Sequence, residues 1–470
     1  MTDHDSHLEA FKAYDVRGRI PEELNARLAE MIGRAYVELI HPSRVAVGHD
    51  IRLSGPELTT ALTEGLVAEG VEVVDIGMVG TEEVYYATFA LGLDGGIMVT
   101  ASHNPRDYNG LKFTREKARP ISADTGLIDM EQSVLAALRS EVDGVARQPG
   151  PRSGRGSIER ADTRADYVKH LLTYIDAAKL RPLKIVVNAG NGGAGMIIDL
   201  LESSLPFTFV KVHNDPDGNF PNGVPNPMLT ENRAATKDAV LAHKADLGIA
   251  WDGDFDRCFF FDEKGTFIEG YYVVGLLAER ALKRHPGGKI VHDPRLVWNT
   301  EEVVRAAGGQ PVLCKSGHAF IKEKMRAVDA AYGGEMSAHH YFKEFSYCDS
   351  GMIPWLQVAE AMSESGRSLS DMVEERMARY PVSGEINLTL SDAKLGLEHV
   401  RRAYENDALS LDETDGLSFE FEQWRFNVRM SNTEPVVRVN VETRADRKLL
   451  EHKTQEVLEV LKAAAPGDRE

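Results

Sequence analysis

The chain has 470 residues, and its 54 Lys and Arg against 73 Asp and Glu give a formal net charge of −19. This acidity makes long nucleic acid a poor partner, and the absence of a roughly 20-residue apolar stretch or a signal-peptide core argues against a membrane span or secretion. The three cysteines are widely spaced, which favours a reducing cytoplasm over a disulfide framework or a zinc site.

The N-terminal part alternates helical and strand patterns. An amphipathic helix is predicted over residues 22–40 and a second helix over 55–70. Short apolar runs predict strands at 45–48, 71–76 and 96–99. Strands that alternate with helices in this way are typical of a layered α/β architecture.

Strand-to-loop transitions recur along the chain. An apolar run opens into a polar turn at residues 44–50, 184–190 and 289–295. The spacing of roughly 105 to 140 residues is too long for a solenoid and suits three related α/β domains. A second series of strands leads into loops rich in functional side chains, at residues 100–105, 252–257 and 334–339. Ligand sites in α/β sheets commonly lie at such strand ends.

Breaks in the pattern divide the chain into four predicted domains. Residues 148–157 are rich in Pro, Gly and Ser and indicate a linker. A hairpin turn at 264–265 and a helix break at 380–384 mark the other boundaries. The predicted domains are three α/β domains at 1–150, 151–264 and 265–379, and a smaller α+β domain at 380–470. In the last domain, strands are expected near 385–390 and 436–442, and helices at 393–406 and 447–463.

Three aspartates form the most distinctive loop. Asp252, Asp254 and Asp256 alternate with non-acidic residues, and carboxylates this close repel one another unless a cation is present. Oxygen ligands suit Mg²⁺ or Ca²⁺. An EF-hand is disfavoured because Arg257 stands where that loop needs glycine. A solvated acidic turn is the other reading, but the apolar flanks favour a loop between buried strands.

Two further loops carry chemistry. Ser102 lies in a strand-to-loop turn beside His103 and Asn104, and the residues alone leave a nucleophile and a plain turn equally open. Residues 429–435 place a guanidinium, two hydroxyls and an amide in one short loop. Such groups match phosphate oxygens, although a capped turn has the same composition.

Together these loops resemble the α-D-phosphohexomutase family over nearly the whole chain. The resemblance rests on four motifs in the right order, at residues 100–105, 252–257, 334–339 and 429–435. It implies four domains around a central cleft, three of them related. The chain departs from the family at Ala338 and Phe255, where glycine is commoner.

The resemblance also implies roles for individual residues. Ser102 is the expected phosphorylated residue, and Lys112 and His318 are candidates for the general base. A catalytic lysine would need its pKa lowered by a cationic neighbourhood, which the expected cleft could provide. One Mg²⁺ per chain is expected on Ser102, Asp252, Asp254 and Asp256. The residues expected to bind substrate are Arg17, His103, Arg257, Glu335, Ser337, His339, Arg429, Ser431, Asn432 and Thr433.

The implied reaction interconverts mannose 6-phosphate and mannose 1-phosphate through a phosphoserine and a hexose 1,6-bisphosphate, which also acts as activator, and supplies GDP-mannose synthesis. A phosphoglucomutase or a dual-specificity phosphohexomutase is the alternative, because no motif visibly reads the sugar 2-hydroxyl. A Mg²⁺-dependent phosphatase and a non-enzymatic sugar-phosphate sensor stay open as other classes. The expected partner is a small phosphosugar in the cytoplasm; the oligomeric state is not predicted.

Overall fold

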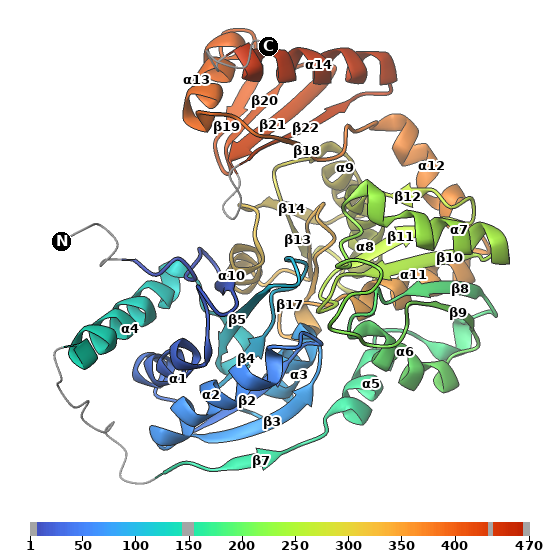
Figure 1. Cartoon of the computed structure of the whole chain (residues 1–470). Coiled ribbons are helices and arrows are strands. Elements are labelled where there is room, and N and C mark those ends of the chain that lie inside the picture. Colours follow the sequence, from blue (N-terminus) through green and yellow to red (C-terminus); the bar gives the residue numbers. More distant parts are fainter. Residues whose placement is uncertain (1–6, 143–154, 431–435, 464–470) are drawn as a thin grey trace. The chain divides into compact units, whose positions relative to one another are not determined.

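The computed structural model describes residues 7–142, 155–430 and 436–463 (Figure 1). The chain forms two compact units. The first comprises Met1–Phe267 and Glu344–Ser365, and the second comprises Ile268–Lys343 and Gly366–Glu470. None of the helices within the described ranges is long and apolar enough to cross a membrane.

The first sheet of the first unit has the strand order β1-β5-β4-β2-β3-β7, and β6 pairs with β5. Its central strands are parallel, whereas β5 runs antiparallel to β4 and β1. The strands are β1 (Val16–Arg19), β2 (Arg44–His49), β3 (Glu72–Met78), β4 (Gly95–Val99), β5 (Tyr108–Arg115), β6 (Arg119–Pro120) and β7 (Ile158–Arg160). The accompanying helices are α1 (Ala26–Ile40), α2 (Gly55–Ala68), α3 (Thr81–Ala90) and α4 (Leu127–Val142).

Helices cover both faces of this sheet, because successive strand residues point to opposite sides. Val45 and Val47 of β2 belong to a core shared with α1, α2 and α4. Ala46, between them, belongs to a second core with α3. The α1 and α2 backbones approach closely: a Cβ on Gly65 would lie 2.2 Å from the Glu30 carbonyl oxygen.

The second sheet of the first unit has the order β12-β11-β10-β8-β9. Its strands are β8 (Lys184–Asn188), β9 (Thr208–Val212), β10 (Leu247–Trp251), β11 (Cys258–Phe261) and β12 (Phe267–Ile268). Its helices are α5 (Arg164–Leu172), α6 (Ala194–Leu201), α7 (Ala234–His243) and α11 (Met352–Ser365).

The segment containing β17 (Cys348–Asp349) and α11 returns to the first unit after the chain has entered the second. Trp251 Nε1 donates to the Gly351 carbonyl at 2.9 Å, and the Asp176 amide donates to Glu360 Oε1 at 2.6 Å. These contacts fix the returning segment against the second sheet.

The second unit contains an α/β part and a C-terminal part. In the α/β part the strands run in the order β14-β13-β15-β16. Its elements are α8 (Gly270–Arg284), β13 (Lys289–His292), α9 (Trp298–Ala306), β14 (Gln310–Leu313), α10 (His318–Val328), β15 (Tyr332–Gly334), β16 (His340–Phe342) and α12 (Leu369–Arg379).

The C-terminal part is an antiparallel sheet of order β18-β22-β21-β20-β19, with two helices whose apolar side chains share its core. Its elements are β18 (Ile386–Leu388), α13 (Ala393–Tyr404), β19 (Ser410–Asp412), β20 (Leu417–Glu420), β21 (Trp424–Met430), β22 (Val437–Thr443) and α14 (Arg447–Ala463).

Most elements predicted from the sequence are present, with changed ends. The helix expected from residue 22 begins at Ala26, because Asn25 caps it by accepting the Leu28 amide at 3.1 Å. Strands β19 to β21 were not predicted. Arg429 and Met430, assigned to a loop from the sequence, belong to β21. Residues 148–154 of the expected linker and 431–435 of the expected phosphate loop lie outside the described residues.

Candidate functional site

Ser102 lies in a strained turn just beyond the end of β4. Its φ is +49°, a left-handed conformation that costs a non-glycine residue about 1–2 kcal/mol. The residue is only 4% exposed. Its Oγ donates to Asp252 Oδ2 at 3.0 Å and lies 3.0 Å from His103 Nδ1. Strain of this kind persists where the surrounding structure enforces it, and it is concentrated at functional sites.

The three aspartates predicted to bind metal are brought together by the turn after β10. Asp252, Asp254 and Asp256 are buried, and each offers a carboxylate oxygen within 4.8 Å of the others. Phe255, between them, has a φ of +45°. Its ring lies so close to Gly80 that a Cβ there would stand 2.2 Å from it. The residue that departs from the family pattern thus packs the acidic loop against the start of α3.

Two cations face the carboxylates. Lys112, on β5, places Nζ 2.7 Å from Asp254 Oδ2 and 2.6 Å from Asp256 Oδ2. Arg257 Nε donates to Asp252 Oδ2 at 2.7 Å. Burial alone would raise the pKa of Asp254, but Lys112 and the hydroxyl of Thr81 outweigh it and hold that pKa below its usual range. Three carboxylates against two cations leave an excess of negative charge.

A catalytic Lys112 would need a pKa lowered by nearby cations, but its surroundings in this structure are mainly acidic. Burial does lower the pKa, but the negative charges of Asp254 and then Asp256 outweigh it and raise the pKa well above the usual lysine value. Lys112 is therefore an ammonium group that donates to two carboxylates. Its role as a general base stays a prediction.

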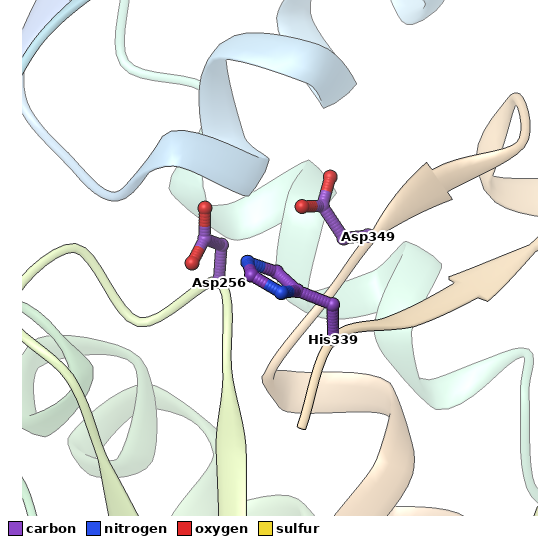
Figure 2. A group of neighbouring side chains, drawn as sticks. All are labelled: Asp256, His339 and Asp349. Atoms are coloured by element: carbon purple, nitrogen blue, oxygen red, sulfur yellow. The ribbon is translucent and has the colours of Figure 1, made fainter. Parts of the chain in front are cut away.

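A fourth carboxylate adds to this charge within the first unit. Figure 2 shows Asp256, on the turn after β10, and Asp349, on β17; His339, also drawn, belongs to the second unit. A carboxylate oxygen of Asp349 lies within 4.8 Å of one of Asp256. Burial, and then the nearby charge of Asp254, raise the pKa of Asp256 well above the ordinary value, and Asp349 acts in the same direction.

The acidic cluster could hold a metal ion. The donors are carboxylate oxygens, which hard cations prefer. Asp254 Oδ1 is buried, and within the described part of the chain it has no hydrogen-bond partner. A buried charged oxygen without a partner is costly. A divalent cation at this oxygen would remove that cost, so the residues present fit such an ion.

Arg17, His103 and Arg257 surround the serine. Arg17 Nη1 donates to Asn104 Oδ1 at 2.6 Å, and its Nη2 pairs with Asp15 at 2.5 Å. Arg257 Nη2 lies 2.5 Å from His103 Nδ1. Desolvation, then the positive charges of Arg257 and Arg17, lower the pKa of His103 well below its ordinary value. The guanidinium groups of Arg17 and Arg257 thus place positive charge beside the serine, whereas His103 is neutral.

In the second unit, Glu335 organises the loop between β15 and β16. It accepts from the Gly317 amide at 2.9 Å and from the Tyr341 hydroxyl at 2.5 Å, and His339 Nδ1 lies 3.6 Å away. Burial raises the pKa of Glu335. The ring of His318, at the start of α10, lies 6.5 Å from that of His339. Ser337 accepts from Arg295 at 3.2 Å.

Arg429 belongs to a cluster of three guanidinium groups in the second unit. Arg295, Arg429 and Arg438 all approach the buried carboxylate of Glu385, at 3.1, 3.8 and 3.7 Å. Burial raises the pKa of Glu385, but the three positive charges outweigh it and the pKa is lowered. Arg429 is also 3.8 Å from Asp415. Arg295 and Arg429 are buried and Arg438 is half-buried. Guanidinium groups gathered in this way can bind a phosphate through charge-assisted hydrogen bonds.

The structure thus gathers the predicted residues into one group in each unit. Ser431, Asn432 and Thr433 lie outside the described residues. Sequence reasoning missed four neighbours of Ser102 and its acidic loop, namely Asp50, Arg52, Thr81 and Thr100. The sequence did carry one signal for Asp50 and Arg52. Asp50-Ile51-Arg52 directly follows β2, just as Asp293-Pro294-Arg295 directly follows β13.

Four family models match the chain in order. They describe phosphoglucomutase/phosphomannomutase alpha/beta/alpha domain I at residues 8–133, domain II at 165–265, domain III at 269–380, and the C-terminal domain at 385–460. With the sheets described above, they confirm the predicted fold class of three related α/β domains and a smaller C-terminal α+β domain.

Relatives of known name cover nearly the whole chain. "Phosphohexose mutases" of Xanthomonas campestris pv. campestris is 60% identical over 455 residues, 97% of this chain and 99% of that protein. "Phosphomannomutase" of Salmonella montevideo is 57% identical over 461 residues, with the same coverage. A solved phosphoglucomutase/phosphomannomutase family protein from Burkholderia thailandensis is 34% identical, covers 98% of both chains and has a TM-score of 0.85.

Proposed function

Because this chain belongs to the phosphoglucomutase/phosphomannomutase family and is a mutase of the isomerase class, we propose that it interconverts mannose 6-phosphate and mannose 1-phosphate. The name of the Salmonella relative supports mannose as the sugar. The alternative is a phosphoglucomutase or dual-specificity phosphohexomutase, which the wider name of the Xanthomonas relative favours. Supply of mannose 1-phosphate to GDP-mannose synthesis in the cytoplasm is part of the proposal.

The observation that carries the mechanism is the buried, strained Ser102 whose Oγ lies 3.0 Å from the acidic cluster. In the proposed reaction, the bond between phosphorus and Ser102 Oγ breaks while one forms to the free sugar hydroxyl, whose proton passes to a base. The product is a hexose 1,6-bisphosphate. Its other phosphate then returns to Ser102, and the second hydroxyl regains a proton. Added hexose 1,6-bisphosphate would activate the enzyme by phosphorylating Ser102.

One Mg²⁺ per chain would be held by Asp252, Asp254 and Asp256 together with Ser102. When bound, the ion would neutralise charge that develops on the transferred phosphoryl group. Lys112 and Arg257 already hold the carboxylates in fixed positions. Arg17 and His103, beside the serine, would bind substrate oxygens.

The proposed roles in the second unit separate sugar from phosphate. Glu335 and Ser337 would bind sugar hydroxyls, His339 would contact the substrate, and His318 is the second candidate for the proton transfer. Arg429, with Ser431, Asn432 and Thr433, would bind the phosphate that is not reacting. The three guanidinium groups around Glu385 support an anion site there. The four-domain division at 1–150, 151–264, 265–379 and 380–470 is retained as part of the proposal.

The test combines one variant with two substrates. Ser102→Ala should lose nearly all turnover of mannose 1-phosphate, and intact-mass analysis should show one phosphate on the natural protein that the variant lacks. Ser140→Ala, at a half-buried serine on α4 whose hydroxyl donates to the Ala136 carbonyl, is the matched control and should keep full activity. A coupled assay with glucose 1-phosphate, run in parallel, decides between the two sugars.

Two results would contradict the proposal. If Ser102→Ala kept the natural rate, the phosphoserine mechanism would be wrong. If a trace of hexose 1,6-bisphosphate failed to activate dephosphorylated enzyme, a phosphatase would explain the acidic loop better, because a phosphatase needs no bisphosphate.

A further inference from the structure

The peptide unit of Ser102 is held from both sides by one buried ion pair. We propose that Asp50 and Arg52, which follow β2, are positioning residues that keep Ser102 in its left-handed conformation and so aim its Oγ at the acidic cluster. This inference rests on the proposed role of Ser102 as the phosphoryl carrier. Neither residue touches the reacting atoms, so both act through the loop.

Arg52 ties the loop together through backbone carbonyls. Its Nη2 donates to the carbonyls of Ser102 at 2.9 Å and Asn104 at 2.6 Å. Its Nη1 donates to those of Pro105 at 2.7 Å and Tyr108 at 2.8 Å. A single planar fork therefore fixes four carbonyls from Ser102 to the start of β5. Lysine could not reproduce this geometry, because its ammonium is a single point donor.

Asp50 holds the other side of the same peptide through Thr100. Its Oδ2 accepts from the Thr100 hydroxyl at 2.6 Å, and the hydroxyl oxygen accepts from the Ser102 amide at 2.8 Å. Oδ1 of Asp50 accepts from the Arg52 amide at 2.9 Å, and the Arg52 Nε lies 3.4 Å from Oδ2. The two charges thus close a ring of contacts around Ser102.

The deep burial of Asp50 and Arg52 indicates that their ion pair positions the loop and does not mainly stabilise the fold. Asp50 and Arg52 are each 2% exposed, and the Phe220 ring lies 5.4 Å from the guanidinium carbon of Arg52. Taking two charges out of water costs free energy that their attraction repays only partly. The guanidinium of Arg52 makes nearly all of its hydrogen bonds to one loop. We therefore explain the buried pair by the fixed position that it gives to that loop.

A similar Asp-x-Arg arrangement occurs in the related α/β part of the second unit, although among the described residues Arg295 donates there to side chains and not to backbone carbonyls. The Arg295 amide donates to Asp293 Oδ1 at 2.9 Å, as the Arg52 amide does to Asp50. Asp293 Oδ2 accepts from the Met336 amide at 2.9 Å, and Arg295 donates to Ser337. In both units, an Asp-x-Arg sequence after a strand therefore holds a loop to which we assign substrate chemistry.

Loss of the fork should affect turnover more than binding. A misplacement of about 1 Å at a reacting atom can cost about 100-fold in rate. We expect Arg52→Lys to lower kcat by about that factor, while KM and the Mg²⁺ requirement stay near their natural values. Amides within residues 101–109 should exchange with deuterium faster than in the natural protein.

Arg34→Lys is the matched control. Arg34 is a part-buried arginine of the same unit, and among the described residues its ion pairs are with Glu30 and Glu69. This variant should show the natural kcat and the natural exchange of the 101–109 amides. If Arg52→Lys fails to fold, a second pair of variants, at Thr100, tests the inference. Thr100→Val removes the hydroxyl link and should lower kcat and speed exchange, whereas Thr100→Ser should restore both.

The inference is overturned if folded Arg52→Lys keeps the natural kcat and exchange, or if Thr100→Val and Thr100→Ser behave alike. These outcomes are distinct from failure of the proposed function. Exchange in the 101–109 loop is measured without substrate, whereas the role of Ser102 is judged by Ser102→Ala.

Discussion

At the scale of single residues, the aspartates of the acidic cluster differ in their hydrogen-bond partners. Asp254 accepts from Lys112 and from the Thr81 hydroxyl through one oxygen, while its other oxygen has no partner within the described residues. Asp252 instead accepts hydrogen bonds from Arg257 Nε and from the Ser102 hydroxyl. Two aspartates of one loop thus lie in two different environments.

Replacing Asp254 by asparagine should weaken metal binding, because an amide oxygen carries no net charge. We expect the Mg²⁺ concentration for half-maximal activity to rise at least about 10-fold. Asp238→Asn, at an exposed position on α7, should leave it unchanged. Chelator should abolish the activity of the natural protein reversibly, and full activity in excess chelator would rule the site out.

Arg429→Ala removes a charge-assisted fork from the proposed phosphate site. The loss should be about 1.5–3 kcal/mol, or about 10- to 150-fold in kcat/KM. Arg429→Lys should recover only part of it, because charge returns without the fork. Kinetics with the 1-phosphate and 6-phosphate sugars should show similar losses. An effect in one direction only, or none, would assign Arg429 a structural role.

At the scale of elements, the start of α3 joins the first sheet to the acidic loop. The Thr81 amide donates to the Asp254 carbonyl at 3.1 Å, and its hydroxyl donates to Asp254 Oδ2 at 2.5 Å. The Gly80 amide donates to Glu83 at 2.9 Å. The free amides of a helix start thereby gain partners from two chain segments.

The pH dependence of stability should report on this helix start. Burial raises the pKa of Glu83 to about 7 from the ordinary 4.5, although the Gly80 amide and Arg164 oppose it. The folded chain therefore binds this proton more tightly than the unfolded chain. The contribution of Glu83 to stability is full below pH 4.5 and is lost as the pH rises through about 7.

Glu83→Gln should thus be more stable than the natural protein above pH 7, by up to roughly 3 kcal/mol, and similar to it near pH 4.5. Urea unfolding at several pH values measures this difference. The exposed Glu64→Gln on α2 should follow the natural profile. A Glu83→Gln profile parallel to the natural one would contradict the assignment.

Local patterns explain which elements could be predicted. The helices α1, α13 and α14 bury one face, so their apolar residues recur at helical spacing and predict a helix. The strand β21 was not predicted, although Trp424, Phe426 and Val428 alternate with polar residues in its sequence. The role of Arg52 could not be predicted, because its four acceptors are backbone carbonyls. Every residue has a carbonyl, so the residue types do not show which of them Arg52 contacts. The pairing of Ser102 with Asp252 came only from the family resemblance, since these residues are far apart in the chain.

At the scale of the whole molecule, buried charges join separate sheets within a unit. In the second unit, Arg425 of β21 donates to the carbonyls of Pro294 and Arg295, which follow β13. It also pairs with Glu442 at 2.9 Å, and Glu442 accepts from the Val297 amide at 2.7 Å. The C-terminal sheet is thereby fixed to the α/β part of that unit.

Removing this link should destabilise the second unit. Arg425→Met leaves Glu442 buried without its cation, which should cost about 3–5 kcal/mol. Urea unfolding should show the loss, and hydrogen exchange should locate it in residues 268–343 and 366–463. Arg402→Met, at an exposed site on α13, should be neutral. A loss of less than about 1 kcal/mol, the value of a surface pair, would show that the link is unimportant.

The return of residues 344–365 to the first unit has a consequence for how the protein is made. A ribosome delivers the chain from its N-terminus, yet the first unit is complete only when Ser365 has emerged. By then, residues 268–343 of the second unit have already been synthesised. Until α11 arrives, its apolar docking surface on the nascent first unit stays open to water, and no single cut in the gene yields either unit whole.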